Sequence, residues 1–171
     1  MKMLIALPCY NEGETIKKVI GDIPRTYEGI DQVHILVVDD GSADQTTAYA
    51  QEAGATVIRH MQNKGLGMAF RSAVDYAIEH DYDIMVNMDG DGQFNSENIS
   101  RLIAPILNHE ADFVTGSRFM EGKKIENMPS VKRWGNARMN QLVSALCGQK
   151  FSDVSCGFRA YSRETLLKIN F

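Results

Sequence analysis

The fold is decided by a stretch in the first third of the chain, Val33-His34-Ile35-Leu36-Val37-Val38-Asp39-Asp40-Gly41-Ser42. Its apolar, largely β-branched first part predicts a buried strand over residues 33–38, and the polar residues after it predict a turn. Upstream, an apolar run over residues 2–7 predicts another buried strand, and a helical pattern over residues 15–23 lies between the two. Strand, helix and strand in this order indicate a parallel sheet.

The same alternation continues downstream. Further strands are predicted over residues 56–59, 84–88 and 113–115, and helices over residues 45–52, 66–79, 96–107, 139–147 and 163–169. The sequence thus predicts an α/β fold with a mostly parallel central sheet flanked by helices. In such sheets, ligands bind at the carboxyl ends of the strands, and polar clusters follow several of the predicted strands here.

Length and composition limit the class of protein. The chain has 171 residues, 44% hydrophobic and 23% charged, which is enough for one domain with a real core, so a single domain over residues 1–171 is predicted. No apolar run is long enough to span a bilayer, and no signal-peptide pattern precedes the first strand. Three scattered cysteines without metal-ligand spacing indicate reduced thiols in a cytoplasmic protein.

The formal net charge of −4 is unevenly distributed. Residues 1–117 hold 8 Lys/Arg against 18 Asp/Glu, whereas residues 118–171 hold 10 against 4. We therefore expect the basic end of the chain to meet an anion. Nucleic acid is not the expected partner, because the basic region lacks interleaved aromatic residues and the chain is acidic overall.

The strongest sign of chemistry is Asp89-Gly90-Asp91-Gly92-Gln93, directly after a predicted strand. Two carboxylates at positions i and i+2 of an extended turn can face the same way, and their hard oxygen atoms suit Mn²⁺ or Mg²⁺. Such a site keeps waters and takes its remaining ligands from a phosphate-bearing substrate. The alternative is an acidic turn that caps the following helix.

Three other clusters lie near strand ends. Asp39 and Asp40 cannot both be helix caps, so at least one is predicted to be functional, for example on a ribose or a base edge, while Asp44 caps the next helix. The segment Pro8-Cys9-Tyr10-Asn11-Glu12 either contacts a base and ribose or is a helix-entry turn. The segment Asn63-Lys64-Gly65 either lies near the ligand or is a plain helix start.

Six motifs follow one another between residues 8 and 159, within a resemblance that runs from residue 3 to about 165. They are Pro8-x-Tyr10-Asn11-Glu12, Val38-Asp39-Asp40-Gly41-Ser42-x-Asp44-x-Thr46, Asn63-Lys64-Gly65, Asp89-x-Asp91-Gly92-Gln93, Gly116-Ser117-Arg118 and Ser152-Asp153-x-x-x-Gly157-Phe158-Arg159. In this order they resemble the family 2 glycosyltransferases with the GT-A (nucleotide-diphospho-sugar transferase) fold. The most similar branch is the dolichol-phosphate mannosyltransferase-like group. One departure is Gly90, where that family often has Ala.

The resemblance implies an inverting, metal-dependent transferase that moves a sugar from a GDP- or UDP-sugar to a polyprenyl (dolichyl or undecaprenyl) phosphate. It places the nucleotide sugar at Pro8, Tyr10, Asn11, Glu12, Asp39, Asp40, Lys64, Gly65 and Asp89. It places the metal, Mn²⁺ or Mg²⁺, on Asp89 and Asp91, with Gln93 near the metal, sugar or acceptor. Arg118, Arg133 and Arg159 would face the acceptor phosphate or the sugar.

Alternative functions remain open at this point. If the acceptor is a saccharide or protein hydroxyl, a base is required, and Asp153 is the candidate. A non-catalytic nucleotide-sugar-binding module is a further alternative. A sugar-1-phosphate nucleotidyltransferase ranks low, because its basic, Gly-rich first loop is replaced here by an acidic one. The four histidines match no motif position and receive no catalytic role.

The resemblance also carries expectations about location. Action at the cytoplasmic face of the membrane, with peripheral membrane contact, follows from a lipid-linked acceptor. The chain ends at Phe171 inside a predicted helix, so the sequence is expected to be a piece truncated at its C-terminal end, with transmembrane helices beyond residue 171 in some members. Neither the oligomeric state nor the identity of the nucleobase follows from the motifs.

Overall fold

The computed structural model describes residues 1–92, 95–117, 130–148, 153 and 156–169. The chain forms two compact units, residues 1–114 together with 159–171, and residues 115–158. In the described part, no helix has the length and apolar character that crossing a membrane requires.

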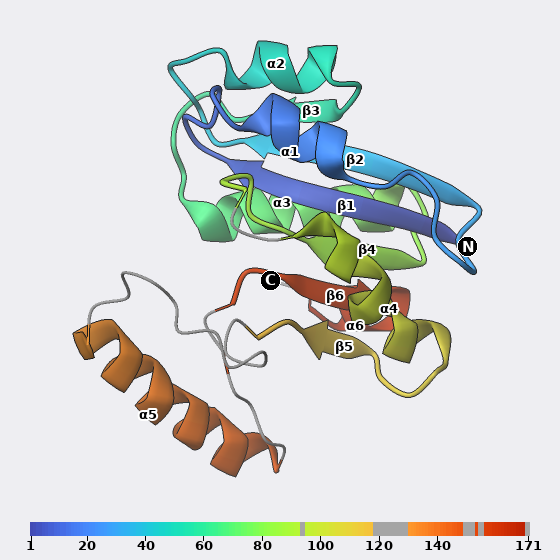
Figure 1. Ribbon diagram of the computed structural model, residues 1–171, viewed down its shortest axis with the longest axis vertical. Coiled ribbons are helices and arrows are strands. Elements are labelled where there is room, and N and C mark those ends of the chain that lie inside the picture. The colour runs from blue at the N-terminus through green and yellow to red at the C-terminus, as the bar shows by residue number, and fades with distance from the viewer. Residues whose placement is uncertain (93–94, 118–129, 149–152, 154–155, 170–171) are drawn as a thin grey trace. The chain divides into compact units, whose positions relative to one another are not determined.

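A six-stranded sheet has the strand order β3-β2-β1-β4-β6-β5 (Figure 1). Its strands are β1 (Lys2–Cys9), β2 (Gln32–Asp39), β3 (Thr56–Arg59), β4 (Ile84–Asn87), β5 (Phe113–Thr115) and β6 (Arg159–Ser162). β1 pairs in parallel with both β2 and β4, and β2 pairs in parallel with β3. β4 and β6 are antiparallel. The predicted mostly parallel α/β sheet is confirmed.

Helices cover both faces of this sheet. They are α1 (Ile16–Asp22), α2 (Thr46–Glu52), α3 (Leu66–Glu79), α4 (Ile99–Leu107, after the 3₁₀ turn η1, Ser96–Asn98) and α6 (Arg163–Lys168). α1 and α4 lie on one face and α3 on the other (Figure 1). The remaining helix, α5 (Ser130–Cys147), belongs to the second unit.

The core follows from the two-residue period of β1. Leu4 and Ala6 pack in one buried cluster with Ala69 and Ala73 of α3. Residues between them in sequence point to the opposite face, where the apolar residues of α1 are also buried. Both faces of the central strands are therefore covered, which explains why these strands are apolar throughout.

The structure differs from the predicted elements at three main places. α5 begins at Ser130, nine residues before the helix predicted over residues 139–147, because its first half is mostly polar and shows no apolar period. β1 continues through Pro8 to Cys9, because its pairing with β4 stops at Ala6 while its pairing with β2 continues. Proline lacks an N–H, and it is tolerated where the strand has lost one of its two neighbours. Strand β6 was not predicted, since only two of its four residues are buried and its partner lies far upstream in sequence.

Candidate functional site

A cavity of about 270 Å³ lies at the carboxyl ends of β1, β2 and β4. The loops after these three strands and the start of α3 contribute its walls, and the residues that line it are Pro8, Cys9, Tyr10, Glu12, Asp40, Asn63, Gly65, Leu66, Ala69, Asp89, Gly90 and Asp91. The polar clusters at the first, second and fourth strand ends therefore meet, as the strand-end argument predicts.

Asp89 and Asp91 follow β4, and both are partly buried. Within the described ranges, no group of three or more Asp, Glu, His or Cys side chains is arranged to hold a metal ion. By their number, two carboxylates can supply only part of a cation's coordination shell. That fits a cation whose other ligands are phosphate oxygens and water, and Asp89 and Asp91 line a cavity with room for them.

The glycine between these carboxylates is explained by a close contact. A Cβ at Gly90 would lie 2.5 Å from Sγ of Cys9 and 3.6 Å from Cδ1 of Ile16. Real Cβ atoms do not approach other atoms that closely, so Gly90 leaves room for the Cys9 side chain. Burial, followed by the negative charges of the surrounding carboxylates, raises the pKa of the Cys9 thiol far above its ordinary value. Cys9 is thus a neutral packing residue.

We expect Gly90→Ala to destabilise the turn that carries Asp89 and Asp91, lowering the free energy of unfolding by about 1–3 kcal/mol. In the double variant Cys9→Ala/Gly90→Ala the obstructing sulfur atom is absent, so most of that loss should be recovered. Urea unfolding of the wild type, both single variants and the double variant measures the coupling. Strictly additive effects would contradict the contact.

Asp40 is 4% exposed and fixes the wall of the cavity formed by the start of α3. Its Oδ1 accepts hydrogen bonds from His60 Nδ1 (2.6 Å) and from the backbone N–H of Lys64 (2.9 Å). Its Oδ2 accepts one from the N–H of Gly65 (2.7 Å). Burial acts to raise the pKa of Asp40, but these hydrogen bonds outweigh it and hold the pKa below the ordinary 3.8.

Because the folded-state pKa of Asp40 is depressed, its ionised form stabilises the fold above the ordinary pKa, and this contribution is lost as the pH falls through the lowered value. Asp40→Asn should therefore cost about 2–3 kcal/mol at pH 7 and show a weaker loss of stability below pH ~4 than the wild type. Unfolding curves from pH 7 to 2.5 test this, with exposed Asp75→Asn on α3 as control. Parallel pH profiles of wild type and Asp40→Asn would refute it.

Asp39, Asn11 and Lys64 do not line the cavity, although all three were predicted at the nucleotide. Oδ1 of fully buried Asp39 accepts from the N–H of Ser42 (2.8 Å), and its Oδ2 accepts from the Thr47 hydroxyl. Asn11 adopts a positive φ of 58°, and its Oδ1 accepts from the N–H of Ala43 (2.9 Å). The Asn11 bond fastens the first loop to the second, and the Asp39 bonds fasten the second loop to the start of α2, so both support the residues that do face the cavity.

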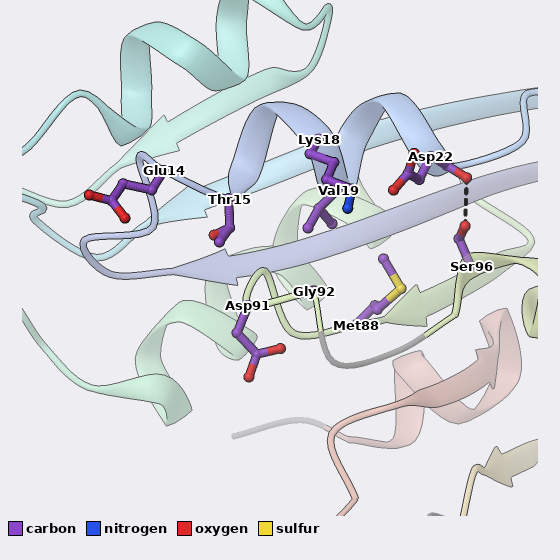
Figure 2. A pocket seen from close by; sticks show the side chains of 9 residues that line it. All are labelled: Glu14, Thr15, Lys18, Val19, Asp22, Met88, Asp91, Gly92 and Ser96. Atoms are coloured by element: carbon purple, nitrogen blue, oxygen red, sulfur yellow. Dashed lines mark hydrogen bonds between the residues drawn. The ribbon is translucent and has the colours of Figure 1, made fainter.

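A second cavity, of about 230 Å³, lies between α1 and the segment that follows β4 (Figure 2). The residues that line it are Glu14, Thr15, Lys18, Val19, Asp22, Met88, Asp91, Gly92 and Ser96. Asp91 lines both cavities, and Figure 2 shows its carboxylate directed away from the side chains of Thr15 and Val19. The Asp89–Gly92 turn thus has a cavity on either side.

The structure describes only some of the residues that were predicted on the acceptor side. Gln93 and Arg118 lie outside the described residues, and so does the side chain of Arg133, whose backbone belongs to α5. Arg159 opens β6 opposite Asn87 in the antiparallel register, and its positive charge acts to lower the pKa of Tyr161. Burial nevertheless raises the pKa of Tyr161 above its ordinary value.

In the second unit, Asp153 is 1% exposed. Two of the sequence motifs meet in this unit, since the N–H of Gly116 donates to the carbonyl oxygen of Phe158 (2.8 Å). A Cβ at Gly116 would lie 3.0 Å from the Phe158 ring, which explains the glycine. These contacts give the Gly116 and Gly157-Phe158 motifs a structural role.

The sequence model for Glycosyl transferase family 2 matches residues 4–169. Polyprenol monophosphomannose synthase of Mycolicibacterium smegmatis is 35% identical over 175 residues, which cover 99% of this chain and 64% of that protein. UDP-N-acetylglucosamine--dolichyl-phosphate N-acetylglucosaminyltransferase of Methanococcus voltae is 32% identical, covering 95% of this chain and 70% of that protein.

Among solved structures, glucosyl-3-phosphoglycerate synthase of Mycobacterium tuberculosis in complex with Mn²⁺, UDP-glucose and glycerol 3-phosphate has a TM-score of 0.70 at 26% identity. The match covers 95% of this chain and 57% of that one, so the chain spans little more than half of that protein and about two thirds of the curated relatives. The likeness confirms the predicted GT-A-type fold.

Proposed function

The chain belongs to glycosyl transferase family 2, and from this premise we propose that it is an inverting, metal-dependent transferase of a sugar from a nucleotide-diphosphate donor to a polyprenyl phosphate. The observation that carries the proposal is the cavity of about 270 Å³, where Tyr10, Glu12 and Asp40 lie around the same space as Asp89 and Asp91. A donor combines a flat base with an anionic diphosphate, and this cavity offers an aromatic ring and a pair of carboxylates suited to a cation.

The residues of this chain divide the work of donor binding. Half-exposed Tyr10 offers a ring face to the base. Glu12 offers acceptor oxygens to hydroxyl groups of the donor, while Pro8 and Gly65 shape the wall. The backbone N–H of Lys64 supports that wall through its bond to Asp40. Mn²⁺ or Mg²⁺ held by Asp89 and Asp91 would supply positive charge beside the leaving diphosphate. The structure of the M. tuberculosis relative, which contains Mn²⁺ and UDP-glucose, supports this choice of ligands.

On the acceptor side, the nature of the nucleophile decides what the chain must provide. An acceptor phosphate is already anionic near pH 7, so it needs no general base but only cations that orient it. We assign this orientation to Arg118, Arg133 and Arg159, because a planar guanidinium forms paired hydrogen bonds with phosphate oxygens. We propose that the reaction takes place at the cytoplasmic face of a membrane, with the basic residues toward anionic lipid, because the proposed acceptor is a lipid phosphate.

The alternative acceptor is a hydroxyl group. This alternative is supported by the structure of the M. tuberculosis relative, which contains glycerol 3-phosphate. In that reaction Asp153 would remove the hydroxyl proton. Removal of this carboxylate should therefore lower the rate of transfer to a hydroxyl group much more than the rate of transfer to a phosphate. A positioned general base contributes about 10²–10⁴-fold to the rate.

Asp153→Asn is expected to lower transfer to undecaprenyl phosphate by less than about tenfold, because no proton has to be removed from a phosphate oxygen. The measurement is release of nucleoside diphosphate from UDP-glucose, UDP-N-acetylglucosamine and GDP-mannose with Mn²⁺, using either undecaprenyl phosphate or glycerol 3-phosphate as acceptor. Circular dichroism confirms that the variant is folded. The proposed lipid acceptor would be wrong if the wild type turns over only with glycerol 3-phosphate and Asp153→Asn lowers that rate by more than about 10²-fold. The acceptor would then be a hydroxyl group.

The donor proposal has its own test, which needs no acceptor. Thermal unfolding with UDP, GDP, CDP and TDP, each with and without Mn²⁺, should show a metal-dependent rise in Tm for one nucleotide. The base that stabilises the chain identifies the donor class. Binding of a nucleotide without turnover on any acceptor would favour a non-catalytic binding module. If no nucleotide changes the Tm, the proposed donor site is wrong.

A further inference from the structure

We propose that His60 is a positioning residue for donor binding, acting through Asp40 on the backbone of Lys64 and Gly65. The inference rests on the proposed function, because it concerns the same cavity. His60 matches none of the sequence motifs and does not line the cavity itself. It lies directly after β3, where its N–H continues the strand ladder by donating to the carbonyl oxygen of Asp39 (2.8 Å).

The ring of His60 joins two parts of the fold. The residue is 8% exposed, and both ring nitrogens have partners. Nδ1 lies 2.6 Å from Oδ1 of Asp40, and Nε2 lies 2.9 Å from Oγ of Ser72, on α3. Because a carboxylate only accepts, Nδ1–H donates to Asp40, and Nε2 shares the second hydrogen bond with the Ser72 hydroxyl. Hydrogen bonds at both nitrogens therefore fix the orientation of the ring. The ring in turn fixes the orientation of the Asp40 carboxylate.

That carboxylate determines a wall of the cavity. The N–H groups of Lys64 and Gly65 both point at Asp40, and Gly65 is the residue before α3, with a φ of 88°. Asp40 and Gly65 line the cavity together. If Asp40 turns, the N–H of Lys64 loses its acceptor and the N–H of Gly65 keeps only Oδ1 of Asn63 (3.0 Å), so the segment that forms the wall is held less firmly. The His60 contact thus controls the shape of the donor site without touching the donor.

Two substitutions separate this role from simple packing. In His60→Asn the amide NH₂ takes the place of Nδ1–H and keeps the bond to Asp40, while the contact with Ser72 is lost. In His60→Gln the amide reaches the place of Nε2 and keeps Ser72, while the bond to Asp40 is lost. Both variants remove the aromatic ring, so a packing role predicts similar effects for the two.

We expect His60→Gln to raise the Kd of the preferred nucleoside diphosphate, and the KM of its sugar donor, by about tenfold or more with kcat changed less than about threefold. His60→Asn should stay within about threefold of the wild type in both quantities. Calorimetric titration with UDP and GDP in the presence of Mn²⁺ gives Kd. Equal binding by both variants and the wild type, whatever their Tm values, would overturn the positioning role.

Failure of the donor proposal looks different, because then the wild type itself would bind neither UDP nor GDP. If His60→Gln does not fold, the positioning role is tested instead by measuring the exchange of backbone amide hydrogens in Ser72→Ala. Faster exchange at Lys64 and Gly65, with unchanged exchange in β1, supports the chain of contacts from Ser72 to the cavity wall. Unchanged exchange at Lys64 and Gly65 overturns it.

Discussion

Asp91→Asn is expected to lower donor turnover by about 10³-fold or more while the free energy of unfolding changes by less than about 1 kcal/mol. Asp91 is only partly buried and lines both cavities, so an amide of the same shape fits without repacking. Its carboxylate charge is what a divalent cation requires, and a neutral amide oxygen is a much weaker ligand. Without that cation, the charge that grows on the leaving diphosphate is not neutralised.

The measurement is nucleoside diphosphate release at saturating donor and Mn²⁺, together with urea unfolding of each variant. Asp75→Asn serves as the matched control, because its carboxylate is exposed on α3 and lies 3.9 Å from Arg71. The control should retain wild-type turnover. Wild-type-like activity of Asp91→Asn, or turnover of the wild type that is unaffected by a chelator, would show that these carboxylates do not hold a required metal.

Gly41→Ala is expected to lower the free energy of unfolding by about 2–5 kcal/mol and to weaken nucleotide binding. Gly41 has a φ of 79°, which disfavours any side chain. Its Cβ would also lie 2.6 Å from the carbonyl carbon of Gln62 and 2.8 Å from the backbone nitrogen of Asn63. Both are backbone atoms, so relief requires the segment that leads to Gly65 and the cavity to move.

Gly54→Ala separates the two causes of this effect. Gly54 has a similar φ of 84°, but a Cβ there would meet nothing within 4 Å. It should therefore cost only the conformational penalty of about 1–2 kcal/mol and leave nucleotide affinity unchanged. Chemical denaturation and nucleotide titration of both variants test the comparison. Equal losses of stability with equal affinity would mean that the Gly41 contact contributes nothing.

Most of the sheet could be predicted because the pattern of β1, β2 and β4 is local. Apolar residues recur over four to eight positions, and polar residues mark where each strand ends. β6 could not, because it is a four-residue strand whose place depends on pairing with β4, more than 70 residues away in sequence. With only two buried residues, β6 carries too few apolar positions to show a period.

The candidate site, like the sheet, could be predicted only in part. Motif order placed Tyr10, Glu12 and Asp89 near one ligand, and the structure brings these residues to a common cavity. Asp39 and Asp40 could not be told apart from their position alone. Consecutive residues at a strand end point to opposite sides, so Asp39 meets Thr47 of α2 while Asp40 meets His60 and the segment before α3.

By itself, the sequence determined the α/β alternation, the parallel sheet and the loops that carry carboxylates, because these depend on hydrophobic period and on residues adjacent in the chain. Only the tertiary structure decided which carboxylate faces the cavity, why Gly90 must accompany Cys9, and that His60 reaches Asp40. Those choices depend on packing between residues that lie from 20 (His60 and Asp40) to 81 (Gly90 and Cys9) positions apart in sequence, and no local pattern records such contacts.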